Sequence, residues 1–126
     1  MKLHGLVGGR AEVCGPETTL QDAADAMLEA GVGSIAVIDG PRLTGILTER
    51  DLLRATADGA DPSEELVRDW MTVDPDVTSP ESEVRDAAKW MLEIGYRHLP
   101  VMEDNELLGI VSIKDLLWVL VSDKDQ

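Results

Sequence analysis

The sequence contains one cysteine, no phenylalanine and no long apolar segment. The single cysteine, Cys14, cannot form an internal disulfide, so the cysteine content favours a reducing compartment. The longest apolar run, residues 116–121, is far shorter than the roughly 20 residues that a membrane-spanning helix needs. The first residues also lack the charged start and long apolar run of a secretory signal. We therefore expect a cytoplasmic protein that does not enter a membrane.

Basic side chains are scarce as well. There are 11 lysines and arginines against 25 aspartates and glutamates, which gives a net charge of −14. A field of this sign repels the phosphates of nucleic acids and the headgroups of anionic membranes. We expect neither as a partner.

The residues of common catalytic and metal sites are also few. Two histidines and one cysteine without ligand spacing do not define a metal site. Serine and histidine are sparse, and no nucleophile, base and orienting residue stand out as a set. We expect no metal, no catalytic residue and no obligatory cofactor.

The most informative feature of the sequence is an internal duplication. Residues 13–53 and 77–117 align without a gap and share 17 identical residues. The 126 residues amount to one ordinary domain, with 44% apolar residues as in a globular protein. Half of the chain alone, at about 55 residues, would be only marginally stable. We therefore expect two copies of one unit that share a core.

The first copy predicts the order strand, helix, strand, strand, helix. Residues 11–14 form a short strand, and Thr18 with Gln21 has the spacing of a capping box that opens an amphipathic helix. Gly31 ends that helix. Residues 34–38 and 43–47 are strands joined by an Asp-Gly turn, with a proline that lengthens the loop. A hydroxyl-to-acid spacing at residues 48–51 opens the second helix.

The second copy has the same order, with a helix from about residue 83 to 94, strands at 99–102 and 107–111, and a last helix from 112. Short leads precede the copies at residues 3–7 and 67–71, and Gly8-Gly9 predicts a looser entry into the first. The expected boundaries are 1–57 for the first unit, 58–66 for the connector, 67–121 for the second unit and 122–126 for a tail.

This order predicts a mixed α+β fold. A strand, a helix and a parallel strand form a right-handed crossover, and the hairpin adds an antiparallel third strand. Each unit then has a small mixed three-stranded sheet with both helices on one face. We expect the bare faces to pack together about a pseudo-twofold axis, with the helices outside and two matching clefts at the margins.

One short motif occurs twice, at residues 45–51 and 109–115. It consists of a glycine, two apolar residues, a residue with a hydroxyl, two variable residues and an aspartate. One interpretation is structural: the glycine allows close packing, and the hydroxyl and acid cap a helix. The other is functional. A helix N-terminus binds phosphate, a hydroxyl there donates to a phosphate oxygen, and an aspartate one turn later accepts from both hydroxyls of a ribose. Arg50 and Lys114 beside the aspartates supply countercharge.

Together with the segment from Tyr96 to Val101, the repeat and both motifs resemble a pair of CBS domains, the module named after cystathionine β-synthase. The resemblance covers about residues 1–121, so we expect a stand-alone pair without an attached enzyme or channel domain. It implies clefts that bind AMP, ADP or ATP, with S-adenosylmethionine ranked below them, a role in energy sensing, and association into homodimers of pairs.

The resemblance also implies roles for individual residues. Asp51 and Asp115 hold ribose, and Thr48 and Ser112 meet phosphate. The adenine lies against backbone and apolar groups at the first two strands of a unit, and cations near the motif balance the phosphate. The adenine set is Val13, Cys14, Ser34, Ile35, Val77, Thr78, Pro80, His98, Leu99 and Pro100. The cations are Arg50, Arg97, His98 and Lys114.

The copies differ at these positions. Arg97 and His98 stand where the first copy has Gly33 and Ser34, so the surroundings of the second motif are more cationic. One cleft can therefore bind a ligand well while the other stays empty or selects another ligand. Separately, the last helix is apolar around most of its circumference, and we expect it to form a homodimer interface with the helix that carries Trp90.

Two functions are compatible with these features. The first is a regulatory module that binds an adenine nucleotide and signals through dimer shape or through its affinity for a regulated protein. The second is a ligand-independent dimerisation or scaffold module, in which the hydroxyl and aspartate only cap helices. An enzyme that acts on a nucleotide ranks well below both.

Overall fold

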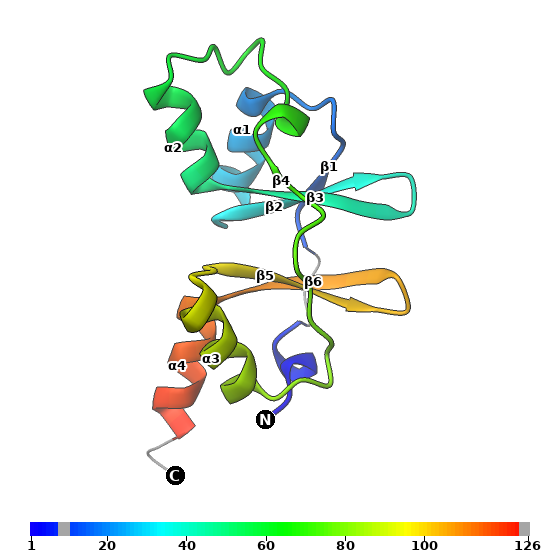
Figure 1. The fold of residues 1–126 in the computed structure, drawn as a ribbon, viewed down its shortest axis with the longest axis vertical. Coiled ribbons are helices and arrows are strands. Elements are labelled where there is room, and N and C mark those ends of the chain that lie inside the picture. Colours follow the sequence, from blue (N-terminus) through cyan, green and yellow to red (C-terminus); the bar gives the residue numbers. More distant parts are fainter. Residues whose placement is uncertain (8–10, 124–126) are drawn as a thin grey trace. The chain divides into compact units, whose positions relative to one another are not determined.

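The computed structural model describes residues 1–7 and 11–123, and the chain divides into two compact units (Figure 1). The first-copy unit comprises Ala11–Pro75. The second-copy unit comprises Met1–Arg10 together with Asp76–Gln126. The segment before the first repeat thus belongs with the second copy, whereas residues 67–75 belong with the first. This spatial division differs from the boundaries expected from the sequence, which assigned each lead to the copy that follows it.

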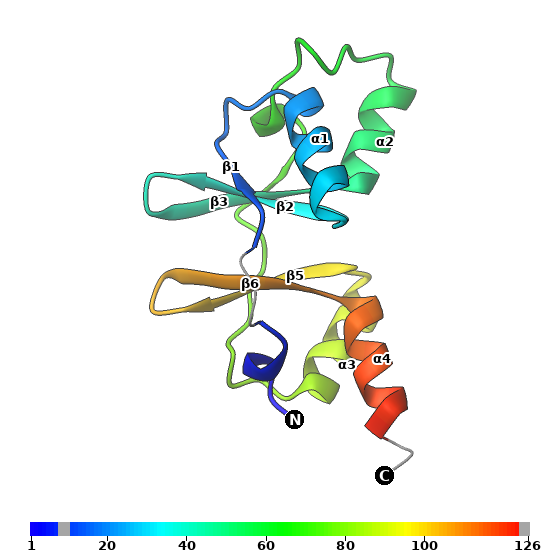
Figure 2. The same ribbon diagram turned by 180° about the vertical axis from the view of Figure 1, so that it is seen from behind.

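The first-copy unit contains the four-stranded sheet. Its strands follow the order β1-β2-β3-β4, with β1 parallel to β2 and the other neighbours antiparallel. The helices α1 and α2 lie on one face of the sheet (Figures 1 and 2). The elements are β1 (Val13–Cys14), α1 (Leu20–Ala30), β2 (Ser34–Asp39), β3 (Arg42–Thr48), α2 (Glu49–Ala57), the 3₁₀ turn η2 (Val67–Asp69) and β4 (Thr72–Val73).

The core of this unit lies between the helices and the sheet. Leu20, Ala23 and Met27 fall at helical spacing and are the buried residues of α1. They pack with apolar side chains of β2, β3, α2 and the η2 turn. The helix ends at Gly31, whose φ of 70° is the left-handed conformation that favours glycine. The buried cluster consists of Leu20, Ala23, Met27, Ile35, Val37, Leu47, Ala55 and Val67.

The second-copy unit repeats this order around a two-stranded sheet, and its two helices also share one face (Figure 1). In place of a β1 counterpart, Thr78 makes a single parallel bridge to Val101. The helix α3 ends at Gly95, again with a left-handed φ. The elements are the 3₁₀ turn η1 (Leu3–Leu6), α3 (Val84–Ile94), β5 (His98–Glu103), β6 (Glu106–Ser112) and α4 (Ile113–Asp123).

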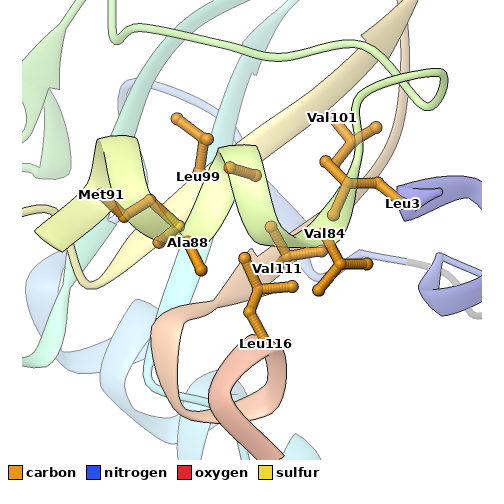
Figure 3. Packing of buried hydrophobic residues seen from close by; sticks show 9 residues of the cluster. Leu3, Val84, Ala88, Met91, Leu99, Val101, Val111 and Leu116 are labelled. Atoms are coloured by element: carbon orange, nitrogen blue, oxygen red, sulfur yellow. The ribbon is translucent and has the colours of Figure 1, made fainter. Parts of the chain in front are cut away.

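The second core includes a residue from the other end of the chain. Leu3 is fully buried among side chains of α3, β5, β6 and α4 (Figure 3). Backbone bonds hold its segment, because the amide of Leu3 donates to the carbonyl of Ser82 and that of His4 to Pro80. The buried cluster consists of Leu3, Val84, Ala87, Ala88, Met91, Leu99, Val101, Val111 and Leu116.

The mixed α+β class is confirmed, but the strand counts differ from the expected three per unit. The first-copy unit gains β4 because the chain after η2 pairs with Gly45 and Ile46 of β3. Among the described residues of the second-copy unit, only β5 and β6 form a sheet. The expected looser entry at Gly8-Gly9 lies outside the described residues. The packing of one unit against the other, and the cleft expected between them, stay predictions.

Two local predictions were wrong. The N-cap of α1 is Thr19 rather than Thr18: its side chain accepts from the amide of Asp22, while Gln21 donates to Asp25 instead of reaching back. The hairpin between β2 and β3 is not lengthened by Pro41. The register pairs Asp39 with Arg42, which leaves a two-residue loop whose first member, glycine, has a φ of 61°.

Across residues 1–7 and 11–123, none of the helices is long and apolar enough to cross a membrane.

Candidate functional site

The first motif joins β3 directly to α2 and forms a complete capping box. The side chain of Thr48 accepts from the amide of Asp51 at 3.4 Å, and the Asp51 carboxylate accepts from the amide of Thr48 at 2.9 Å. These reciprocal bonds satisfy two backbone donors at the start of the helix. The predicted helix cap is therefore confirmed in the first copy, whereas a role of the motif in ligand binding stays a prediction.

The Asp51 carboxylate has a further partner that the sequence interpretation missed. The Arg54 guanidinium donates to Asp51 Oδ1 at 2.8 Å and also to the carbonyl of Trp70 at 3.3 Å. The side chain of Asp51 is only 9% exposed. Burial of a carboxylate is costly unless it is hydrogen-bonded, and here the capping box and the arginine provide those bonds. The missed signal was an arginine three residues after the aspartate.

The second motif joins β6 to α4 and is only half of a capping box. The amide of Asp115 donates to Ser112 Oγ at 3.1 Å. The carboxylate of Asp115 is on the surface and accepts no hydrogen bond or ion pair within the part of the chain that the structure describes. Its two oxygens remain available to a ligand, unlike those of Asp51.

Strand pairing brings the start of β5 beside the second motif. His98 is the register partner of Ser112, and the amide of Ile113 donates to the carbonyl of Arg97 at 2.8 Å. Arg97 and Lys114 are exposed, and neither takes part in the ion pairs found among residues 1–7 and 11–123. The structure thus gathers the predicted cations and the hydroxyl of this copy at one edge of the sheet.

The first copy has the same geometry with fewer charges. Ser34 is the register partner of Thr48, and the amide of Glu49 donates to the carbonyl of Gly33 at 3.0 Å. Ser34 is buried, and Arg50 is exposed. Only one cation of the predicted set therefore lies in this unit.

The residues predicted to meet adenine divide into two groups. Ile35 and Leu99 are fully buried in the two cores, so only their backbone could face a ligand. Pro80 and Pro100 are also buried. Surface access remains at β1 and at the corresponding segment of the second copy, where Val13 is 53% and Val77 is 41% exposed, with Cys14 and Thr78 partly buried beside them.

The β1 strand runs parallel to β2, and a single bridge holds the corresponding segment of the second copy beside β5. Val13 lies opposite Ala36 in β2, and Thr78 lies opposite Val101 in β5. The amide of Thr78 donates to the carbonyl of Pro100 at 2.9 Å. In the first-copy unit, β2 therefore lies between the predicted adenine contacts of β1 and the predicted phosphate contact at the end of β3. In the second-copy unit, β5 lies between Thr78 and the end of β6 in the same way.

Cys14 is poorly suited to nucleophilic chemistry. Burial raises the pKa of its thiol above the ordinary value of 9.0, and the hydrogen bond with Thr18 only partly opposes this effect. A raised pKa keeps the thiol protonated at neutral pH. In the described residues, no group of three or more histidine, cysteine, aspartate or glutamate side chains is arranged to hold a metal ion.

The fold and the motifs define a class of protein: a tandem pair of helix, strand, strand, helix units, each with a hydroxyl and an aspartate at the start of its last helix. The family model of the CBS domain matches residues 10–58 and again residues 67–122. The chain belongs to the CBS domain family and carries two copies of the domain. The resemblance inferred from the repeat is confirmed.

Known relatives are similar to this chain over most of its length. A 17.7 kDa protein of Acidianus ambivalens is 38% identical over 122 residues, which cover 95% of this chain and 73% of that protein. A solved CBS-domain protein of Burkholderia ambifaria aligns with a TM-score of 0.89 and 27% identity over 98% of this chain and 96% of that one. CBSX2 of Arabidopsis thaliana, solved in complex with AMP, aligns with a TM-score of 0.81 and 25% identity over 96% and 97%.

Other relatives are longer than this chain. It spans 61% of a protein of Methanopyrus kandleri and 37% of one of Methanocaldococcus jannaschii. It also spans 21% of the inosine-5'-monophosphate dehydrogenase of Korarchaeum cryptofilum, to which it is 36% identical over 104 residues. Similar pairs therefore occur within larger proteins, including an enzyme.

Proposed function

We propose that the chain is a regulatory CBS pair that binds an adenosine-containing ligand, AMP, ADP or ATP, beside Ser112 and Asp115. The observation that carries the proposal is the exposed Asp115 carboxylate at the start of α4, with His98 at the start of β5 and Arg97 just before it. The complex of the related CBSX2 with AMP supports the ligand class. Occupancy would alter dimer shape or the affinity for a regulated protein.

Each group of the proposed ligand has a chemical counterpart in this unit. The Asp115 carboxylate can accept from both ribose hydroxyls. Ser112 Oγ accepts from the Asp115 amide, so its own proton remains available to a phosphate oxygen. The positive end of α4 and the Lys114 and Arg97 side chains favour the negative charge of a phosphate. The exposed side chain of Val77 offers an apolar surface to the adenine.

Calorimetric titration with AMP, ADP, ATP and S-adenosylmethionine tests the proposal. We expect at least one adenine nucleotide to bind, and we expect Asp115→Ala to weaken it by at least about tenfold, the effect of losing hydrogen bonds to a charged group. Asp86→Ala is the matched control, because it removes the same charge from an exposed position in the first turn of α3. Equal affinities of Asp115→Ala and the parent protein would refute the ribose assignment.

A ligand-independent dimerisation module is the second candidate, and the α3 and α4 helices favour it. These helices pack together and leave Leu92, Leu117, Trp118 and Val121 exposed. Exposed apolar groups of this size at helical spacing are typical of an interface, and we propose a second copy of the chain as the partner. Sedimentation with and without AMP separates the candidates: a dimer that ignores every nucleotide would favour this second function.

A further inference from the structure

The two copies differ three residues after the aspartate of the motif, at a position that affects the hydrogen bonding of that aspartate. With the repeats aligned at their 64-residue offset, Arg54 of α2 corresponds to Trp118 of α4. Arg54 lies three residues after Asp51 and forms an ion pair with it at 2.8 Å. Trp118 lies three residues after Asp115, is 73% exposed, and cannot form an ion pair with a carboxylate.

Both oxygens of the Asp51 carboxylate accept hydrogen bonds within its own unit. Oδ2 accepts from the Thr48 amide at 2.9 Å and from the Thr48 hydroxyl at 3.2 Å, and Oδ1 accepts from Arg54. A ribose that binds through two hydroxyls needs two free acceptor positions on the carboxylate, and each carboxylate oxygen offers about two. Oδ2 of Asp51 already accepts from both the amide and the hydroxyl of Thr48. At Asp51 the ribose would therefore have to displace the guanidinium from Oδ1, which would leave a nearly buried carboxylate without its countercharge.

Arg54 is held in place by a second contact. It also donates to the carbonyl of Trp70, whose indole N–H in turn donates to Glu65 Oε1 at 3.1 Å. The arginine is therefore bonded to the segment at residues 67–71 as well as to the aspartate. This second contact reduces the entropy cost of keeping the ion pair formed. The described contacts of Asp115 contain no counterpart of this arrangement.

From this difference we propose that Arg54 determines nucleotide occupancy: it withholds Asp51 from ribose, so the chain binds one adenosine-containing ligand, at Asp115. The inference rests on the proposed function and adds a residue that neither motif contains. Arg54 is a positioning residue, since it acts through Asp51. The presence of tryptophan at the corresponding position leaves the second motif open.

Removing the Arg54 side chain tests the proposal, with AMP as the titrant and the calorimetric stoichiometry as the readout. We expect one site per chain in the parent protein and two in Arg54→Ala, because Oδ1 of Asp51 is then free while the capping bonds to Oδ2 remain. Adding Asp51→Asn to Arg54→Ala should return the stoichiometry to one. Arg85→Ala, an exposed arginine of α3, controls for the loss of charge.

The converse experiment introduces an arginine beside Asp115 and should reduce ligand binding there. Trp118→Arg places an arginine three residues after Asp115 and should weaken AMP binding by about tenfold or more, the range for competition by an ion pair. Trp118→Ala controls for the loss of the indole and should keep one site. If Arg54→Ala does not fold by circular dichroism, Arg54→Trp repeats the test with the residue of the other copy.

The outcomes distinguish the two proposals. Two sites in the parent protein, or one site in a folded Arg54→Ala, would overturn the role of Arg54 while the proposed function stands. Absence of AMP, ADP and ATP binding in every variant would overturn both. One site in the parent protein that rises to two on loss of Arg54, and needs Asp51 to do so, supports the inference.

Discussion

Gly45, the first residue of the first motif, allows β3 and the segment at Met71 and Thr72 to pack closely. A Cβ at this position would lie 2.9 Å from the carbonyl oxygen of Thr72 and closer still to the sulfur of Met71. The β4 strand therefore needs a glycine opposite it in β3. At Gly109 the nearest atom to a Cβ is a methyl of Val7, at 3.2 Å, and no backbone carbonyl is as close.

This difference predicts unequal costs for the same substitution. We expect Gly45→Ala to lower the free energy of unfolding by about 1 to 3 kcal/mol, as overpacking does when the backbone must shift. Gly109→Ala should cost less, because a valine side chain can adjust by a few tenths of an ångström. Urea denaturation of both variants measures the difference. Equal costs would show that the close approach of the Met71–Thr72 segment does not limit the size of the side chain at position 45.

The Cys14 thiol gives a second prediction at this scale. Because burial raises its pKa, the thiol is protonated in the folded state over a pH range where the unfolded chain already ionises. The folded state then binds the proton more tightly, so this group's contribution to stability is present below the ordinary value of 9.0 and is lost as pH rises above it. Alkylation by iodoacetamide should show a pH midpoint that is higher in the native protein than in urea, and equal midpoints would contradict the assignment.

At the scale of elements, the two helix N-termini should differ in stability. Thr48→Ala removes an acceptor for the Asp51 amide and a donor to a buried carboxylate, so we expect a loss of about 1 to 2 kcal/mol. Ser112→Ala removes one exposed contact and should cost about 0.5 to 1 kcal/mol. Thr56→Ala, a hydroxyl exposed on α2, is the control. Thermal unfolding ranks the three, and a larger cost for Ser112 would contradict the account.

The order of elements was predictable, whereas some boundaries and partners were not. Apolar spacing, left-handed glycines and the agreement between copies were enough to predict the helices and hairpins. The cap of α1 was misassigned because Thr18 and Thr19 both carry hydroxyls, and the choice depends on a long-range bridge between Thr19 and Leu66. The β4 strand is too short to show a pattern of its own and forms by pairing with β3.

The candidate site was predictable to a similar degree. The repeat gave both motifs and the cations near the second one, because their positions follow from local spacing and strand register. The engagement of Asp51 by Arg54 was missed, since an exposed arginine on a helix can equally extend into solvent. That choice depends on the Trp70 carbonyl, which comes from a segment 16 residues further along the chain.

At the scale of the whole molecule, the second-copy unit depends on a segment from the other end of the chain. Leu3 is fully buried in the core of the second-copy unit. We expect Leu3→Ala to cost about 2 to 5 kcal/mol, the range for truncating a buried leucine. Leu6→Ala, at a partly buried position of the same turn, should cost less. Chemical denaturation compares them, and a cost for Leu3 below 1 kcal/mol would mean that the segment contributes little to this core.

The proposed dimer offers a test in which the repeat provides its own control. Leu92 and Leu117 of α3 and α4 correspond to Leu28 and Leu53 of α1 and α2, and all four are exposed. Only the second-copy helices add Trp118 and Val121 to this face, so we expect the double substitution of Leu92 and Leu117 by alanine to weaken dimerisation by at least about tenfold, at roughly 0.8 kcal/mol per buried methylene. The matching change at Leu28 and Leu53 should weaken it less.

Charge should modulate the same equilibrium. Two copies that each carry a net charge of −14 repel one another, and this repulsion is screened over about 8 Å at physiological ionic strength. An interface that depends on apolar side chains gains from screening, whereas one that depends on ion pairs weakens. We therefore expect dimer affinity to rise between low and moderate salt, as measured by sedimentation equilibrium. A fall in affinity over that range would place ion pairs, rather than the leucines and Trp118, at the centre of the interface.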